Sequence, residues 1–176
     1  TKVSKLIPAM YRFGLSGSIP DKGDTMMIES QIGDIIFEMS SEELIKGKFL
    51  SKPKIIMKTI FNDMVRGGWK EVQEDFIIKN TKRNKEIVDI SGQERDKFTV
   101  IIVDRIKHGD LLQNMIPGSI FINGQLKKEQ RKLIMHKARA NELKVLIGTV
   151  ISEGIDLPKM DNIIIVKGGG VSIVPT

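Results

Sequence analysis

The chain has 176 residues and no cysteine, which excludes a disulfide framework and any thiolate metal site and fits a reducing compartment. No apolar run approaches the length of about 18 residues that suggests a membrane span, and Thr1-Lys2-Val3-Ser4 has no signal-peptide character, so we expect an internal start. The 28 Lys and Arg residues against 22 Asp and Glu give a formal net charge of +6, which favours a polyanionic partner.

The first part of the chain, about residues 1–46, is predicted to alternate helix and strand. Residues 11–18 (YRFGLSGS) combine apolar side chains with a terminal glycine turn, which predicts a buried strand that ends in a tight turn. A short helix is expected over residues 28–32. A strand carrying three large apolar residues is expected over residues 34–39.

A helix N-terminus follows at Ser40 and Ser41, because a hydroxyl residue before acidic residues such as Glu43 is typical of a capped helix start. Gly47 then breaks the pattern, and residues 51–53 (Ser-Lys-Pro) are expected to belong to a linker. The pattern of the next seven residues (KIIMKTI) predicts the strand that enters the second part of the chain.

The second part alternates helices and strands. Helices are predicted over about 69–91, 107–115 and 128–140, and strands over 98–103, 120–122, 144–147 and 162–166. Strands rich in Ile and Val that alternate with helices are typical of a parallel sheet covered on both faces. The predicted fold class is therefore α/β with a parallel sheet.

Ligands of such sheets bind at the carboxyl ends of the strands. Small, polar or basic residues follow the strands here, and they are Ser16-Gly17-Ser18, Asp104-Arg105 with Lys107, Asn123-Gly124-Gln125, and Gly148-Thr149 leading into residues 152–158. Hydroxyls, lysines and free backbone N–H groups are what a chain of phosphates needs. These residues alone predict a phosphate-rich ligand.

The order of these segments resembles that of superfamily 2 DNA and RNA helicases. Ser16-Gly17-Ser18 resembles motif III, residues 98–112 motif IV, residues 123–131 the hGk…eeR segment, and residues 145–158 motif V, of which 153–158 (EGIDLP) is the most diagnostic piece. Residues 13–18 and the overall layout are similar to DExH-type phage recombination and repair helicases of the UvsW type.

The resemblance implies a domain organisation. Residues 1–46 would be the C-terminal part of a first RecA-like ATPase domain, 47–53 the linker, and 54–176 a second RecA-like domain that ends before the arginine motif. The chain lacks a G-x-x-x-x-G-K-[ST] loop and a D-E-x-H box. We therefore expect a fragment that is inactive alone. The spacing from Thr149 to Gly154 is about one residue shorter than in the family.

The resemblance also implies roles. The coupling of the bound nucleotide's state to nucleic-acid binding would belong to Ser16, Gly17 and Ser18. The nucleotide itself would be contacted by Gly154 and Asp156. The expected nucleic-acid contacts are Asp104, Arg105, Lys107, Asn123, Gly124, Gln125 and Thr149. No catalytic or metal-binding residue is assigned. The complete enzyme would use ATP and Mg²⁺. Its substrate would be single-stranded or branched DNA, with RNA as the alternative. We expect it in the cytoplasm of a bacterium or of a phage-infected cell, with no membrane partner.

Other interpretations remain open. The chain could be a non-catalytic nucleic-acid-binding module with the helicase fold, or a double-strand DNA translocase. Ser16-Gly17-Ser18 could be a plain strand-end turn, Gly154 a glycine needed only for its φ, and Asp156 a cap. His108 is expected on an exposed helix face, and Trp69 is expected to be partly buried or to stack on a base. A solvated face is expected for Lys127, Lys128, Arg131 and Lys132.

Overall fold

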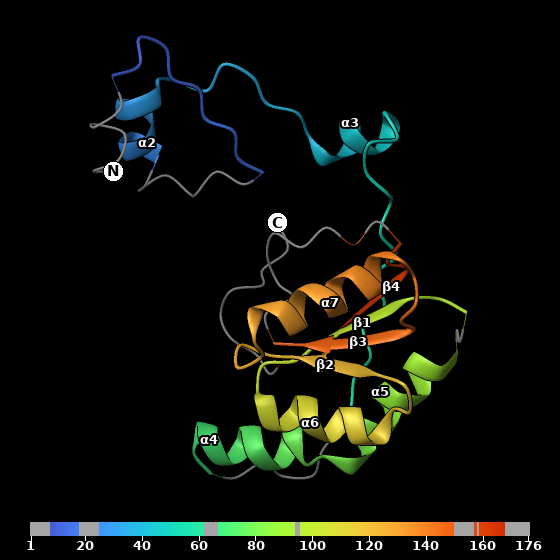
Figure 1. Cartoon of the computed structure of the whole chain (residues 1–176). Helices are drawn as coiled ribbons and strands as arrows, with labels where there is room; N and C mark the ends of the chain where they lie inside the picture. Colours follow the sequence, from blue (N-terminus) through green and yellow to red (C-terminus); the bar gives the residue numbers. More distant parts are fainter. Residues whose placement is uncertain are drawn as a thin grey trace. The chain divides into compact units, whose positions relative to one another are not determined.

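The structure, a computed structural model of the chain, divides into two compact units, Thr1–Met57 and Lys58–Thr176 (Figure 1). The parallel sheet and the helices that cover it belong to the second unit. The residues that the structure describes are 8–17, 25–61, 67–93, 96–149, 157 and 159–167.

The first unit contains two described helices, α2 (Thr25–Ile32) and α3 (Ser41–Lys46). The predicted helix N-terminus at Ser40 is confirmed. The Ser40 hydroxyl accepts a hydrogen bond from the backbone N–H of Glu43 at 3.2 Å, and the Glu43 carboxylate accepts one from the backbone N–H of Ser40 at 2.8 Å. This reciprocal pair satisfies two N–H groups at the helix start. The bond from the Ser40 backbone, and then that from its side chain, lower the pKa of Glu43.

Three predicted strands are wrong. Residues 11–17, 34–39 and 54–60 adopt no strand conformation. Large apolar side chains in them are exposed, Phe13 at 79% and Ile36 at 85%. A strand is stabilised by hydrogen bonds to neighbouring backbone and by burial of its side chains. Among the described residues these segments do not join the sheet, so their apolar composition alone does not make them strands.

The four strands predicted for the second part are confirmed. They are β1 (Thr99–Ile102), β2 (Ile120–Ile122), β3 (Val145–Gly148) and β4 (Asn162–Ile165). They form an all-parallel sheet in the order β2-β3-β1-β4 (Figure 1). Val100 of β1 lies level with Leu146 of β3 on one side and Ile163 of β4 on the other. The predicted α/β fold class is therefore confirmed for this unit.

Helices cover both faces of the sheet (Figure 1). α5 (Thr81–Gln93) and α6 (Ile106–Met115) lie on one face, and α7 (Lys128–Arg139) lies on the other. The strands alternate accordingly: Ile101 faces a core that includes Leu112 of α6, whereas Val100 faces a core that includes Ala138 of α7. Each core buries apolar side chains from sheet and helix together, which is the main stabilising contribution to such a fold.

The helical region predicted over about 69–91 is confirmed with one interruption. It consists of α4 (Trp69–Val72), a π-helical segment η1 (Gln73–Ile78) and α5. Lys79 and Asn80 separate η1 from α5, and Asn80 bonds to both. Its side-chain oxygen accepts a hydrogen bond from the backbone N–H of Arg83 at 3.0 Å, and its side-chain amide donates to the carbonyl of Phe76 at 3.2 Å. The residue thus caps α5 and closes η1.

Candidate functional site at the carboxyl edge of the sheet

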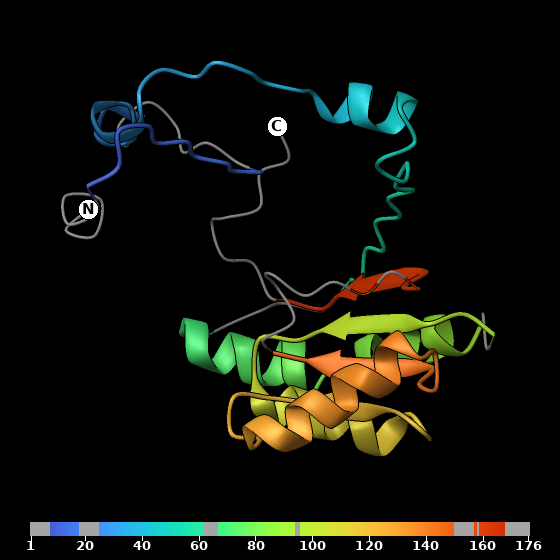
Figure 2. The same ribbon diagram turned by 45° about the horizontal axis from the view of Figure 1, so that its top comes forward.

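The carboxyl ends of the four strands form one row along the edge of the sheet. Figure 2 shows the strand arrows pointing the same way. Just past three strands, backbone N–H groups still donate to carbonyls of the neighbouring strand, and the pairs are Thr149 with Ile122 (3.2 Å), Val103 with Gly148 (3.0 Å) and Val166 with Ile102 (2.9 Å). The structure therefore brings the segments that contain Asp104, Asn123 and Thr149 to the same edge.

The turn after β2 is built by Asn123. Its side-chain oxygen accepts a hydrogen bond from the backbone N–H of Gln125 at 2.9 Å, and its carbonyl accepts one from the Arg131 guanidinium at 3.2 Å. Such a turn is the usual role of asparagine in a loop. Gly124 is exposed and faces open space, and the Gln125 side chain is exposed. Asn123 thus shapes the turn, while Gly124 and Gln125 face solvent.

The loop after β1 contacts the π-helical segment η1. Both Asp104 and Arg105 have half-exposed side chains, and both bond to the buried amide of Gln73. The amide donates to Asp104 Oδ2 at 3.1 Å, and its oxygen accepts from Arg105 Nε at 3.0 Å. Sequence reasoning missed Gln73, because nothing in the pattern of residues 69–79 distinguishes it from other polar helix residues.

A second polar contact joins the same two segments. Lys107 Nζ lies 3.6 Å from Glu74 Oε1, and Lys79 Nζ lies 3.3 Å from that oxygen. The hydrogen bond from Lys79 is the largest influence that lowers the pKa of Glu74. Lys107 is 76% exposed along its side chain, so its ammonium remains open to an anion in solvent.

His108 is buried in the first turn of α6, so its predicted exposure is wrong. The side chain is 1% exposed and lies 2.9 Å from the side-chain oxygen of Asn84, a buried residue of α5. Asn84 lies one turn before Ile87, on the apolar face of α5. A polar side chain at this buried position needs a hydrogen-bond partner. The signal in the sequence was a polar residue at an apolar position of a helical repeat.

Three of the predicted site residues, Ser18, Gly154 and Asp156, lie outside the described residues. Ser16 and Gly17 belong to the first unit and are exposed. Thr149 is half-buried at the end of β3, where its backbone continues the ladder.

Basic side chains extend this edge along α7. Lys127, Lys128 and Lys132 are exposed, as predicted for a solvated helix face, whereas Arg131 is half-buried against the turn after β2.

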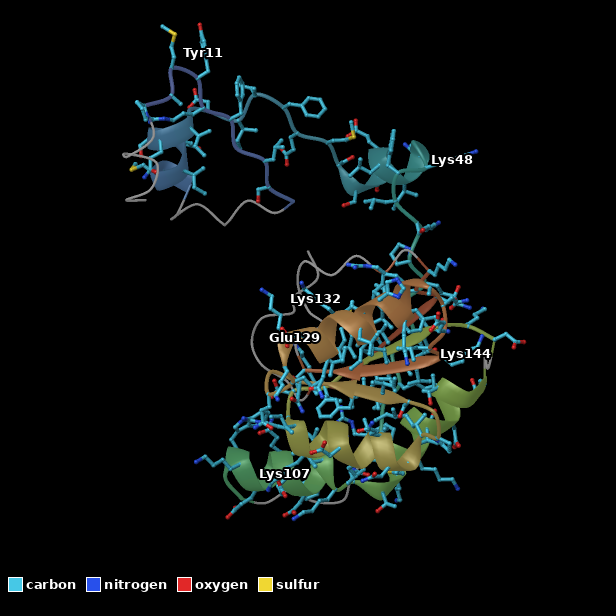
Figure 3. All side chains as sticks on the ribbon, viewed as in Figure 1. Tyr11, Lys48, Lys107, Glu129, Lys132 and Lys144 are labelled. Atoms are coloured by element: carbon cyan, nitrogen blue, oxygen red, sulfur yellow. The ribbon has the colours of Figure 1, made fainter. Side chains whose placement is uncertain are left out.

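Figure 3 shows Lys107 and Lys144 on opposite sides of the second unit. Trp69 is 53% exposed at the first residue of α4.

The described residues contain no cluster of three or more His, Asp or Glu side chains that could hold a metal ion. In the same part of the chain, none of the helices has both the length and the apolar character needed to cross a membrane.

Comparison with known proteins places this unit in a family. Residues 79–168 match the model of the helicase conserved C-terminal domain. Among solved structures, the chain is similar to the helicase domain of Hef from Pyrococcus furiosus, with 17% sequence identity and a TM-score of 0.42. That similarity covers 56% of this chain and 22% of the other. No curated protein matches the chain. Since the family model matches more than half of its residues, the chain belongs to the helicase conserved C-terminal domain family.

Proposed function

We propose that the chain is part of an ATP-dependent nucleic-acid helicase or translocase of superfamily 2, and that the carboxyl edge of its sheet grips the phosphate backbone. The observation that carries this proposal is the single row of strand ends, which gathers the Asp104-Arg105 loop, the Asn123-Gly124-Gln125 turn and Thr149. Contacts to phosphates position a protein without reading sequence, so the grip would be sequence-independent and would weaken as salt rises.

DNA, single-stranded or branched, is the proposed substrate, in recombination, repair or replication. The finer assignment to the DExH and UvsW type is supported by the resemblance of residues 13–18 and of the overall layout to those helicases. The net charge of +6 fits either nucleic acid, so RNA is the alternative outcome of a binding comparison. The proposed location is the cytoplasm of a bacterium or of a phage-infected cell.

ATP and Mg²⁺ enter the proposal through the longer protein. Residues 1–46 would be the C-terminal part of its first RecA-like domain. Residues 47–53 would link the two domains, and residues 54–176 would belong to the second RecA-like domain. Of the residues proposed to contact nucleotide, Gly154 and Asp156 lie outside the described residues. No metal cluster occurs among the side chains that the structure describes. The described residues therefore do not provide a fit for the metal.

A pair of lysines tests the proposed grip. Lys107 follows β1 at the carboxyl edge, whereas Lys144 directly precedes β3 at the amino edge, and both are exposed. Lys107→Ala and Lys144→Ala each remove one positive charge. The plot of log affinity for single-stranded DNA against log salt has a negative slope, and we expect only Lys107→Ala to make it less steep, by about 0.7 for one lost phosphate contact. Equal slopes for the two variants, or binding by the wild-type chain that ignores salt, would contradict the proposal.

A further inference from the structure

The amide of Gln73 holds two charged residues of the loop after β1 in fixed orientations. Gln73 is 5% exposed, and its two amide atoms contact Asp104 and Arg105 at 3.1 and 3.0 Å. A guanidinium only donates hydrogen bonds and a carboxylate only accepts them. The amide oxygen must therefore face Arg105 and the amide nitrogen must face Asp104, and a flipped amide would lose both bonds.

This arrangement leaves the outer end of Arg105 available. The bond to Gln73 uses Nε, which also lies 3.7 Å from Asp104 Oδ2. Among the described residues the structure shows no hydrogen bond from the two terminal nitrogens of Arg105. Its side chain is 55% exposed. A guanidinium anchored through Nε still presents the N–H groups of its two terminal nitrogens, which match the spacing of two phosphate oxygens. The anchor also reduces the side-chain entropy that Arg105 would lose on binding.

We propose that Gln73 is a positioning residue, which orients the guanidinium of Arg105 toward a phosphate of the bound nucleic acid. The inference rests on the proposed function of the carboxyl edge. Gln73 lies before residues 79–168, which match the family model, and at the first residue of the π-helical segment η1. Segments of π-helix are rare and occur frequently at functional sites. The segment would thus add a support for Arg105 from outside the family domain.

The test is a double-mutant cycle on the full chain, with binding of fluorescent oligothymidine measured across a salt series. Gln73→Met keeps the length and volume of the buried side chain but removes both hydrogen bonds. We expect Arg105→Ala to weaken binding about tenfold and to lower the salt slope by about 0.7. Gln73→Met should weaken binding about threefold and lower the same slope in part, because a released Arg105 holds its phosphate less often. In the Arg105→Ala background, Gln73→Met should have no further effect.

Two further variants separate positioning from a general structural effect. In Gln73→Glu/Asp104→Asn the carboxylate and the amide exchange positions. The carboxylate at position 73 then accepts hydrogen bonds from Arg105 and from the amide at position 104, and the net charge does not change. This variant should bind more tightly than Gln73→Met and recover part of its lost salt slope, since Arg105 Nε is again held by an acceptor at position 73. Gln113→Met, on the exposed side of α6, is the matched control and should bind as wild type does.

The outcomes distinguish the two proposals. If Arg105→Ala weakens binding but Gln73→Met does not, or if their effects simply add, the positioning role is wrong and the grip stands. If the wild-type chain shows no salt-dependent binding, both fall together. Thermal melting of each variant identifies loss of fold. If Gln73→Met has a much lower melting temperature than wild type, the double variant Gln73→Glu/Asp104→Asn provides the test. Binding by the folded double variant that is as weak as that of Arg105→Ala overturns the positioning role, and tighter binding supports it.

Discussion

Nε2 of His108 lies 2.9 Å from Oδ1 of Asn84 inside the second unit. The Asn84 amide donates its other hydrogen bond to the carbonyl of Ile78 at 2.7 Å. This bond fixes the side-chain orientation, so Oδ1 is the atom that faces the imidazole and Nε2 carries the proton. Burial, and then the positive charge of Arg83, lower the pKa of His108 to about 4. The fold therefore holds His108 neutral.

Acid should destabilise the second unit through His108. The unfolded residue titrates near its ordinary pKa of 6.5, and the folded one near 4. Between these values the unfolded chain binds more protons, so the stability present above pH 6.5 is lost as pH falls toward 4. The free energy of unfolding should drop by about 2 kcal/mol from pH 7 to pH 5. Urea unfolding at a series of pH values measures it.

His108→Gln provides the control for this prediction. The new side chain keeps a donor for Asn84 but does not titrate. We expect the variant to be less stable than wild type at pH 7, by about 1 kcal/mol for the altered packing, and to lose most of the pH dependence. The same slope in both proteins would show that His108 is not its source.

Two helix glycines should respond oppositely to the same substitution. A Cβ on Gly109 of α6 would overlap ring atoms of Phe121, whereas a Cβ on Gly92 of α5 meets nothing within 4 Å. Gly109→Ala should destabilise the second unit by about 1–3 kcal/mol through overpacking. Gly92→Ala should stabilise it by about 0.5 kcal/mol through reduced unfolded-state entropy. Denaturant midpoints measure both, and a tolerated Gly109→Ala would contradict the close packing of α6 on β2.

The motif V resemblance predicts that Thr149 and Asp156 serve different ligands in a longer, ATP-hydrolysing protein. Asp156→Ala should weaken apparent ATP affinity about tenfold, the loss of a charged hydrogen bond to a ribose hydroxyl, and leave nucleotide-free DNA binding nearly unchanged. Thr149→Val keeps the shape of the strand end and removes its hydroxyl, so it should impair DNA binding and leave basal nucleotide affinity intact. Both affinities are measured for both folded variants, and identical defects would contradict the split.

The chain by itself should not hydrolyse ATP. It contains neither a G-x-x-x-x-G-K-[ST] loop nor a D-E-x-H box, which bind the phosphates and Mg²⁺ in such enzymes. Phosphate release from the purified chain should equal that of a no-protein blank. Turnover above the blank that Asp156→Ala abolishes would overturn this interpretation.

Local patterns predicted much of the second unit. Four apolar runs became strands close to their expected bounds. The inner strands β1 and β3 are almost wholly buried, which needs continuous apolar residues, whereas the edge strand β4 alternates half-buried and exposed side chains. The capped start at Ser40 was also readable, since Ser40 and Glu43 bond within one turn. The same kind of apolar signal failed for residues 11–17, 34–39 and 54–60, which join no sheet in the part of the chain that the structure describes.

The sequence by itself thus determined the apolar runs that supply the four strands of the second unit and the polar residues that follow them, because both are patterns of contiguous residues. Only the tertiary structure decided the order β2-β3-β1-β4 and the contact of Gln73 with Asp104 and Arg105, residues more than thirty positions apart. The burial of His108 against Asn84 was decided in the same way. A hydrogen bond between distant residues depends on how helices pack on the sheet, and no local pattern records that packing.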